Sequence, residues 1–212
     1  VEGPKLMEEL LHSDWKVIKF YATAEWATAH STIQYPIQIV APHELDAISK
    51  WDEGNQVIAI VEKKKDLIYN GHAAIVLDGI QDPGNLGTII RIADWFGIQN
   101  LVVSDDTADM YNPKVIQSTM GSFLRVNFVK TDLNTFFQKN QLPVLGAVLN
   151  GNNIFQQTLP KEAILLIGNE SKGVRPPLVP FITHPVLIPK MGKAESLNAA
   201  VATGIIAAHW RH

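Results

Sequence analysis

The chain has 212 residues, of which 46% are apolar and 18% charged; its formal net charge is −3 and it contains no cysteine. This composition excludes global disorder, disulfide bonds, thiolate metal sites and a cysteine nucleophile, and it fits the reducing cytoplasm. The charge also argues against a protein that grips nucleic acid with its whole surface, so binding to RNA would need a local basic patch.

Two further absences narrow the function. No apolar run reaches the roughly 18 residues of a membrane-spanning helix, and the seven histidines are scattered without metal-ligand spacing. We therefore expect a cytoplasmic protein with no membrane partner and no metal.

The first 62 residues predict a small α/β unit. Apolar spacing predicts helices at 4–12 and 42–51, and apolar runs predict strands at 17–21, 37–40 and 57–61. The charged segment 62–66 then breaks the pattern. We place the domain boundary there, giving domains at 1–65 and 66–212. Lys63, Lys64 and Lys65 fit a solvated linker or part of a basic patch.

From residue 73 onward, apolar strands alternate with helices. We expect strands at 74–77, 101–103, 126–129, 144–148, 163–167 and 186–188, and helices at 87–96, 113–118, 133–139 and 196–210. This alternation predicts an α/β fold with a parallel sheet covered on both faces. The small apolar residues along the last helix fit packing on the sheet or a contact between subunits equally well.

Three segments that follow predicted strands mix glycine with asparagine and charged residues. They are residues 82–91, 166–173 and 188–198. Open α/β sheets bind ligands outside the carboxyl ends of their strands, so three such segments predict one shared ligand site.

Each segment alone also fits an ordinary structural role. Gly84 to Gly87 suits an anion at a helix N-terminus, or a turn capped by Asp82 or Asn85. Arg91 suits phosphate or carboxylate, or an ion pair with Asp94. Glu170 fits a cleft carboxylate or a loop brace, and Ser196 fits the N-cap of the last helix. The chain lacks a GxGxxG fingerprint and a GxSxG elbow, which disfavours a nicotinamide oxidoreductase and a serine hydrolase.

Together the three segments resemble the signature motifs of the SpoU (TrmH) family of RNA 2′-O-ribose methyltransferases, in the SPOUT superfamily. The motif residues are Asn85, Gly87 and Arg91 in the first segment, Gly168, Asn169, Glu170 and Gly173 in the second, and Ile188, Pro189, Gly192, Ser196, Leu197 and Asn198 in the third. Residues 112–122 are similar to the intervening segment of the family, except that Gln117 stands where a basic residue is expected.

The resemblance implies a SPOUT-type parallel sheet with a deep C-terminal trefoil knot. It also implies a homodimer and bound S-adenosylmethionine. The N-terminal unit is similar to the small RNA substrate-binding domain of ribosomal-protein L30e type that many members carry.

The resemblance also assigns roles to residues. It implies cofactor binding by Leu166, Ile167, Gly168, Asn169, Glu170, Gly173, Ile188, Pro189, Met191, Ser196 and Leu197. It implies substrate binding by Asn85, Arg91, Lys190 and Lys193, and catalysis by Arg91, Asn85, Glu170, Ser196 and Asn198. Arg91 either takes the proton of the ribose 2′-hydroxyl or only stabilises its developing charge.

The expected activity is methyl transfer from S-adenosylmethionine to a ribose 2′-hydroxyl, with ribosomal RNA favoured as substrate. A tRNA 2′-O-methyltransferase, a catalytically silent RNA-binding dimer and a base methyltransferase of the same superfamily remain alternatives.

Overall fold

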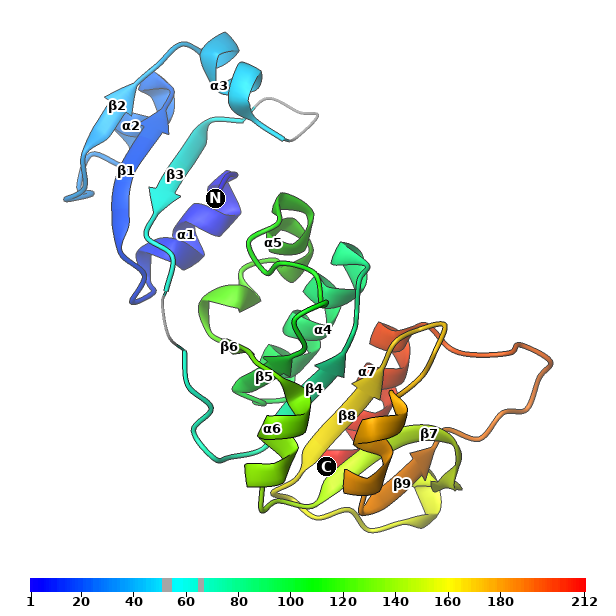
Figure 1. The fold of residues 1–212 in the computed structure, drawn as a ribbon. Helices are drawn as coiled ribbons and strands as arrows, with labels where there is room; N and C mark the ends of the chain where they lie inside the picture. Colours follow the sequence, from blue (N-terminus) through cyan, green and yellow to red (C-terminus); the bar gives the residue numbers. More distant parts are fainter. Residues whose placement is uncertain (51–54, 65–66) are drawn as a thin grey trace. The chain divides into compact units, whose positions relative to one another are not determined.

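The computed structural model describes residues 1–50, 55–64 and 67–212, which form two compact units, Val1–Lys65 and Asp66–His212 (Figure 1). Trp51, at the end of a predicted helix, and Lys65, in the predicted linker, lie outside the described residues. The roles expected of the two domains, RNA substrate binding for 1–65 and methyl transfer for 66–212, stay predictions.

The first unit is a three-stranded sheet with short helices. Its elements are α1 (Pro4–Leu11), β1 (Val17–Ala22), α2 (Ala24–Ala29), β2 (Ile37–Ile39), α3 (Pro42–Ile48) and β3 (Val57–Val61). The order is β2-β1-β3, with β2 parallel and β3 antiparallel to β1. Helix α2 was not predicted, because six residues are too few for a periodic apolar pattern. Its start is fixed by Thr23, whose hydroxyl accepts from the backbone N–H of Trp26.

The second unit is built on a six-stranded sheet in which every strand pairing is parallel. The order is β6-β5-β4-β8-β7-β9, and the strands are β4 (Ala74–Asp78), β5 (Asn100–Val103), β6 (Asn127–Lys130), β7 (Val144–Asn153), β8 (Ile164–Gly168) and β9 (His184–Leu187). The helices are α4 (Pro83–Trp95), α5 (Pro113–Thr119), α6 (Leu133–Lys139) and α7 (Ala199–Trp210), with 3₁₀ helices η1 (Ser122–Leu124), η2 (Ile154–Gln156) and η3 (Pro176–Phe181). The predicted α/β fold with a parallel sheet is confirmed.

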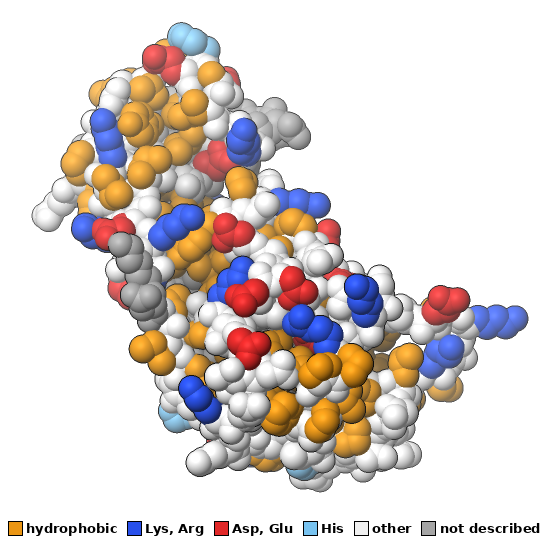
Figure 2. All heavy atoms as spheres, viewed as in Figure 1, with side chains coloured by type: hydrophobic (Ala, Val, Ile, Leu, Met, Phe, Trp, Pro, Cys, Tyr) orange, Lys and Arg blue, Asp and Glu red, His pale blue; other side chains and the backbone are white. Residues whose placement is uncertain are grey.

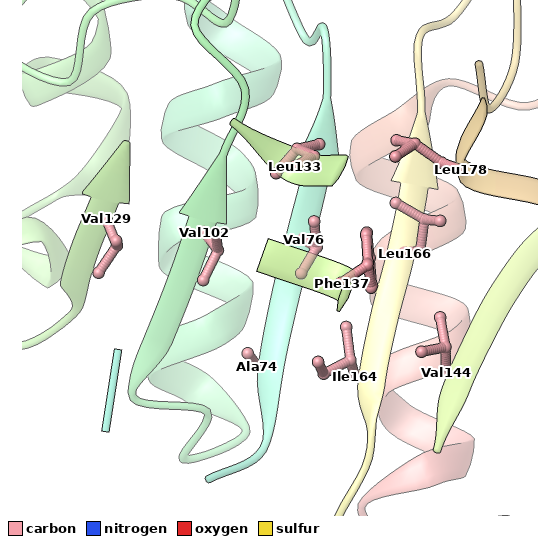
Figure 3. Packing of buried hydrophobic residues seen from close by; sticks show 10 residues of the cluster. All are labelled: Ala74, Val76, Val102, Val129, Leu133, Phe137, Val144, Ile164, Leu166 and Leu178. Atoms are coloured by element: carbon pink, nitrogen blue, oxygen red, sulfur yellow. The ribbon is translucent and has the colours of Figure 1, made fainter. Parts of the chain in front are cut away.

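Alternate residues of the central strands bury opposite faces of this sheet. On one face, Val76 and Leu166 pack with Phe137 of α6 and Leu178 of η3 (Figure 3). Helices α4 and α7 contact each other, and α7 contacts β8. All five residues of β4 are buried, which explains its unbroken apolar run.

Two predicted helix starts were wrong, and both errors concern the motifs. Helix α4 begins at Pro83, so Gly84 to Gly87 form its first turn instead of a loop before it. Asp82 is the N-cap, and its carboxylate accepts from the backbone N–H of Asn85 at 2.8 Å. Helix α7 begins at Ala199, so Ser196 is not its cap. Residues 188–198 form the long loop that leads from β9 to α7 (Figure 1).

Candidate functional site

The first and second motifs meet because β4 and β8 are neighbouring parallel strands. Asp78 at the end of β4 pairs in register with Gly168 at the end of β8. The chain after β4 turns into α4, and the chain after β8 makes the tight turn 169–173. Both segments therefore leave the sheet at the same edge, as the sequence predicts for a shared site.

Asn85 joins all three motifs through its side-chain amide. Its Nδ2 donates to Glu170 Oε1 at 2.8 Å, and its Oδ1 accepts from Asn198 Nδ2 at 2.8 Å. Asn198 in turn caps α7, since its Oδ1 accepts from the backbone N–H groups of Ala200 and Val201 at 2.9 and 3.2 Å. The structure thus brings together three of the predicted catalytic residues.

The hydrogen-bond chain from Asn198 through Asn85 to Glu170 has only one possible direction of donation. Backbone N–H groups only donate, so they fix the oxygen of Asn198 toward α7 and leave its NH₂ for Asn85. An ionised carboxylate only accepts, so Glu170 fixes the NH₂ of Asn85 toward itself. The direction of donation is therefore set at the two ends of the hydrogen-bond chain, by the backbone N–H groups of α7 and by the carboxylate of Glu170. A residue at position 85 that cannot both donate and accept would break this hydrogen-bond chain.

The side chain of Asn169 is used inside the protein. Its Nδ2 donates to the carbonyl of Gly79 at 2.7 Å, and its Oδ1 accepts from the N–H groups of Ser171 and Lys172. Asn169 and Gly173 also exchange backbone hydrogen bonds at 2.8 and 3.1 Å, which close the turn.

Glycine is required at two positions of this turn. Gly173 has φ +68°, a left-handed conformation that L side chains rarely adopt. A Cβ on Gly168 would lie 2.2 Å from the carbonyl carbon of Gly173, so a side chain there would force the turn apart. Leu166 and Ile167 just before it are buried in β8, which leaves only their backbone groups for ligand binding.

Gly87 serves packing between helices, not approach of a ligand. A Cβ at this position would lie 2.4 Å from Cβ of Ser118 and 2.8 Å from the carbonyl oxygen of Val115, both in α5. The absence of a side chain lets α4 and α5 lie in close contact. Helix packing therefore explains Gly87 without a ligand, and anion binding at the N-terminus of α4 stays a prediction.

Arg91 is exposed on α4, one turn beyond Gly87. In the described part of the chain it forms no hydrogen bond or ion pair, and its predicted alternative partner Asp94 pairs with Arg125 instead, at 2.8–3.1 Å. Burial opposes ionisation of Asp94, but hydrogen bonds from Arg125 and Ser122 outweigh it and hold the pKa of Asp94 below its usual value. Arg91 is therefore available to a ligand.

The third motif is only partly anchored. Ile188 and Pro189 are half-buried, whereas the rest of the loop up to Asn198 is exposed. Met191 is 98% and Leu197 48% exposed, which is unusual for apolar side chains beside a motif. The loop residues Lys190, Lys193 and Ser196, all of them described, are exposed as well, and none of them forms a hydrogen bond or ion pair with Asn85 or Glu170.

Sequence reasoning missed a charged cluster at the same edge of the sheet. Asp78 is 1% exposed and accepts from both the backbone N–H and Nε of Arg175. The guanidinium of Arg175 also reaches Asp106 Oδ1 at 3.5 Å, and Asp106 accepts from Ser104 Oγ at 2.6 Å. The hydroxyl of Ser104 is the main cause that lowers the pKa of Asp106. A carboxylate at the end of the apolar run 74–77 was the available signal.

The described residues contain neither a metal-binding cluster nor a membrane-spanning helix. Among residues 1–50, 55–64 and 67–212, no group of three or more His, Cys, Asp or Glu side chains is placed to hold a metal ion. Within the same residues, no helix is both long and apolar enough to cross a membrane. On the face in view, Figure 2 shows lysine and arginine side chains scattered among acidic ones, not gathered into one basic patch.

Residues 72–208 match the SpoU rRNA Methylase family. The chain is 30% identical over 217 aligned residues to 23S rRNA (guanosine(2553)-2'-O)-methyltransferase RlmP of Bacillus subtilis, a match that covers 100% of this chain and 87% of the relative. Three other curated relatives are longer, and the matches cover 50–58% of their lengths.

Solved structures agree with the sequence match. A putative RNA methyltransferase of the TrmH family from Porphyromonas gingivalis is 34% identical, with a TM-score of 0.87, and covers 100% of this chain and 88% of the other. An AdoMet-bound rRNA methyltransferase from Sinorhizobium meliloti is 28% identical, with a TM-score of 0.87, over 100% of this chain and 85% of the other. The family resemblance predicted from the three motifs is confirmed.

Proposed function

This chain belongs to the SpoU rRNA Methylase family, and on that premise we propose that it transfers a methyl group from S-adenosylmethionine to a ribose 2′-hydroxyl of ribosomal RNA. In this transfer a bond from O2′ to the methyl carbon would replace the sulfur–methyl bond, the sulfur would leave as a neutral thioether, and the hydroxyl proton would pass to a base or to water. The observation that carries the proposal is the hydrogen-bonded union of Asn85, Glu170 and Asn198, one residue from each motif.

The residues around this union suit S-adenosylmethionine. A purine ring needs apolar surface, and its edge needs backbone groups. Leu197 and Met191 supply exposed apolar side chains, and residues 189–197, all of them described, form no backbone–backbone hydrogen bond. The carboxylate of Glu170, half-buried and held by Asn85, complements a sulfonium cation.

The proposed roles of the side chains come from the family resemblance. When bound, S-adenosylmethionine supplies the electrophilic methyl group. Backbone groups near 166–170, together with Ile188, Pro189, Ser196 and Leu197, hold the cofactor, with Gly168, Asn169 and Gly173 shaping the turn. Asn85, Glu170, Ser196 and Asn198 orient the ribose and the loops, because attack requires the reacting atoms at about 3–3.5 Å.

Arg91 is the residue that acts on the 2′-hydroxyl. A guanidinium is normally never a base in proteins, so it either loses its proton in a special site or stabilises the developing oxyanion while bound to phosphate. Lys190 and Lys193 would hold the RNA backbone from the exposed loop. Single-turnover methyl transfer by Arg91→Lys and Arg91→Ala tests the role of Arg91, and near-wild-type rates for both would exclude either version.

Ribosomal RNA is favoured because two relatives whose matches cover the whole of this chain are named rRNA methyltransferases. A ribosomal substrate implies a cytoplasmic location. Digestion of in vitro methylated ribosomal and transfer RNA to nucleosides tests this assignment. A 2′-O-methylated ribose from ribosomal RNA supports it, and a methylated base or a product from tRNA alone contradicts it.

Three finer structural features belong to the same proposal. A C-terminal trefoil knot is supported by the order β8-β7-β9 and by the return of α7 to α4. A homodimer is supported by the exposed apolar residues Leu197 and Val201 beside the small residues of α7. An L30e-type role in RNA binding for residues 1–65 is supported by structural neighbours that cover the whole chain.

Isothermal titration with S-adenosylmethionine separates the proposed enzyme from a silent RNA-binding dimer. An intact site gives binding heat that Glu170→Ala reduces, whereas a silent binder gives no heat with either protein. Light scattering of the same samples reports the oligomeric state.

A further inference from the structure

Residues 169–175 contain the tight turn of the second motif and are called the 169–175 turn below. Hydrogen bonds tie this segment at both of its ends to two consecutive residues at the end of β4. At its start, the amide of Asn169 donates to the carbonyl of Gly79 at 2.7 Å. At its end, the backbone N–H of Arg175 donates to Asp78 Oδ2 at 2.7 Å, and Nε of the same residue donates to Oδ1. Gly79 is itself held from β5, because its N–H donates to Ser104 Oγ at 2.9 Å.

We propose that Asp78 and Arg175 are a positioning pair that sets the place of the 169–175 turn, and with it the affinity for S-adenosylmethionine. Neither residue touches the reacting atoms; they act through the turn that carries Glu170. The inference rests on the proposed function, in which this turn holds the cofactor.

Burial makes this pair stronger than an ordinary surface ion pair. The side chain of Asp78 is fully buried, so its charge has no water to stabilise it and depends on Arg175. Arg175 holds both carboxylate oxygens, one through its backbone N–H and the other through Nε. Lysine would keep the backbone N–H but carries a methylene group where arginine has Nε, and its ammonium lacks the planar set of donors of a guanidinium. A shift of the turn would leave a buried carboxylate unpaired, so the turn has one strongly preferred position.

The contact from Arg175 to Asp106 differs in kind. It is 3.5 Å long, and both side chains are about half exposed, so water competes for it. It offers a matched control, because Asp106→Asn removes a negative charge beside the same guanidinium and leaves the grip of Asp78 intact.

The experiment compares Arg175→Lys and Asp78→Asn with Asp106→Asn in the full chain. Titration calorimetry gives the Kd for S-adenosylmethionine, and hydrogen exchange of the cofactor-free protein gives the protection of amides 170–175. We expect Arg175→Lys to raise the Kd and to speed exchange of these amides by about tenfold each, with the KM for RNA changed by less than about twofold. Asp106→Asn leaves the Kd and the exchange within about twofold.

A purely structural role predicts a different result. It would lower the midpoint of thermal unfolding and the folded fraction, while the folded molecules would keep the wild-type Kd and the wild-type exchange of the turn. That result, or equal effects of Asp106→Asn and Arg175→Lys, overturns the proposal. If Arg175→Lys does not fold, Asp78→Asn decides, since it keeps a neutral acceptor for the backbone N–H. If the wild type binds no cofactor, the proposed function fails, and exchange alone decides the positioning role.

Discussion

Replacement of Asn85 tests whether the three motifs are joined by a hydrogen-bond chain of fixed direction. Asn85→Ala removes a bond to a charged carboxylate, worth about 1.5–3 kcal/mol, and a neutral amide bond, worth about 0.5–1.5 kcal/mol. Because Asn85 is only half-buried, water replaces part of each bond, and we expect the free energy of unfolding to fall by about 2 kcal/mol.

Asn85→Asp is the sharper change, because it keeps the shape and the acceptor for Asn198 but reverses the end that faces Glu170. Two carboxylate charges at the observed 2.8 Å would repel by about 1.5 kcal/mol in water and about 6 kcal/mol at an effective dielectric of 20. Relaxation lowers the upper figure, so we expect this variant to be about 1–3 kcal/mol less stable than Asn85→Ala at pH 8.

The difference in the free energy of unfolding between Asn85→Asp and Asn85→Ala should become smaller in mild acid. Repulsion raises the pKa of the introduced carboxyl, and once protonated it can donate to Glu170 as the amide does. Urea unfolding at pH 8, 6.5 and 5 gives the free energy of unfolding of the wild type, Asn85→Ala and Asn85→Asp. Asn112→Asp is the control, because Asn112 caps α5 and aspartate caps a helix equally well. Equal stability of Asn85→Asp and Asn85→Ala at pH 8, or a gap that does not depend on pH, refutes the assigned direction.

Three further predictions concern the surroundings of the site. Gly168→Ala should unfold at a clearly lower temperature and lose cofactor binding, because its Cβ would lie 2.2 Å from the carbonyl carbon of Gly173. Gly192→Ala is the control, since open space surrounds Gly192, and it should change the free energy of unfolding by less than about 0.5 kcal/mol. Equal melting temperatures of the two variants would contradict this prediction. The lowered pKa of Asp94 makes its ion pair stabilising above the unfolded-state pKa and lost as pH falls through the folded-state pKa, so Arg125→Gln should cost stability at pH 7 but not near pH 2, as acid titration of unfolding would show. Burial raises the pKa of Tyr69 to about 12, so the unfolded chain ionises first and stability should fall between about pH 10 and 12. Ultraviolet titration should show a late phenol that Tyr69→Phe removes.

The predictable part of this fold was the part with strong local signals. The strands at the centre of the parallel sheet are unbroken apolar runs, so 74–77 and 163–167 were placed within a residue of β4 and β8. Helix boundaries were harder, because they depend on single capping bonds. Asn198 and Ser196 are both good caps by type, and the bonds to Asn85 and to α7 select Asn198.

The sequence could predict that the motifs lie near one another, but not which of their side chains form hydrogen bonds. The order of parallel strands places the segments after β4 and β8 at one edge, yet which side chains meet there depends on rotamers and distances that no spacing encodes. Gly87 and Asp78 illustrate this. Gly87 has a ligand-binding residue type and serves helix packing, whereas Asp78 ends an apolar run and holds a buried charge.

The two asparagines explain why the motifs are separate in sequence yet act as one site. A site built from one segment could fix its own geometry by local turns. Here the amides of Asn198 and Asn85 link α7 to the turn after β8 by hydrogen bonds, each donating on one side and accepting on the other. An amide can pass such polarity along because its NH₂ group donates and its oxygen accepts, whereas a carboxylate only accepts and an ammonium only donates. The loop 188–198 ends at one of these amides, so ordering of that loop by a ligand would be felt directly at Glu170.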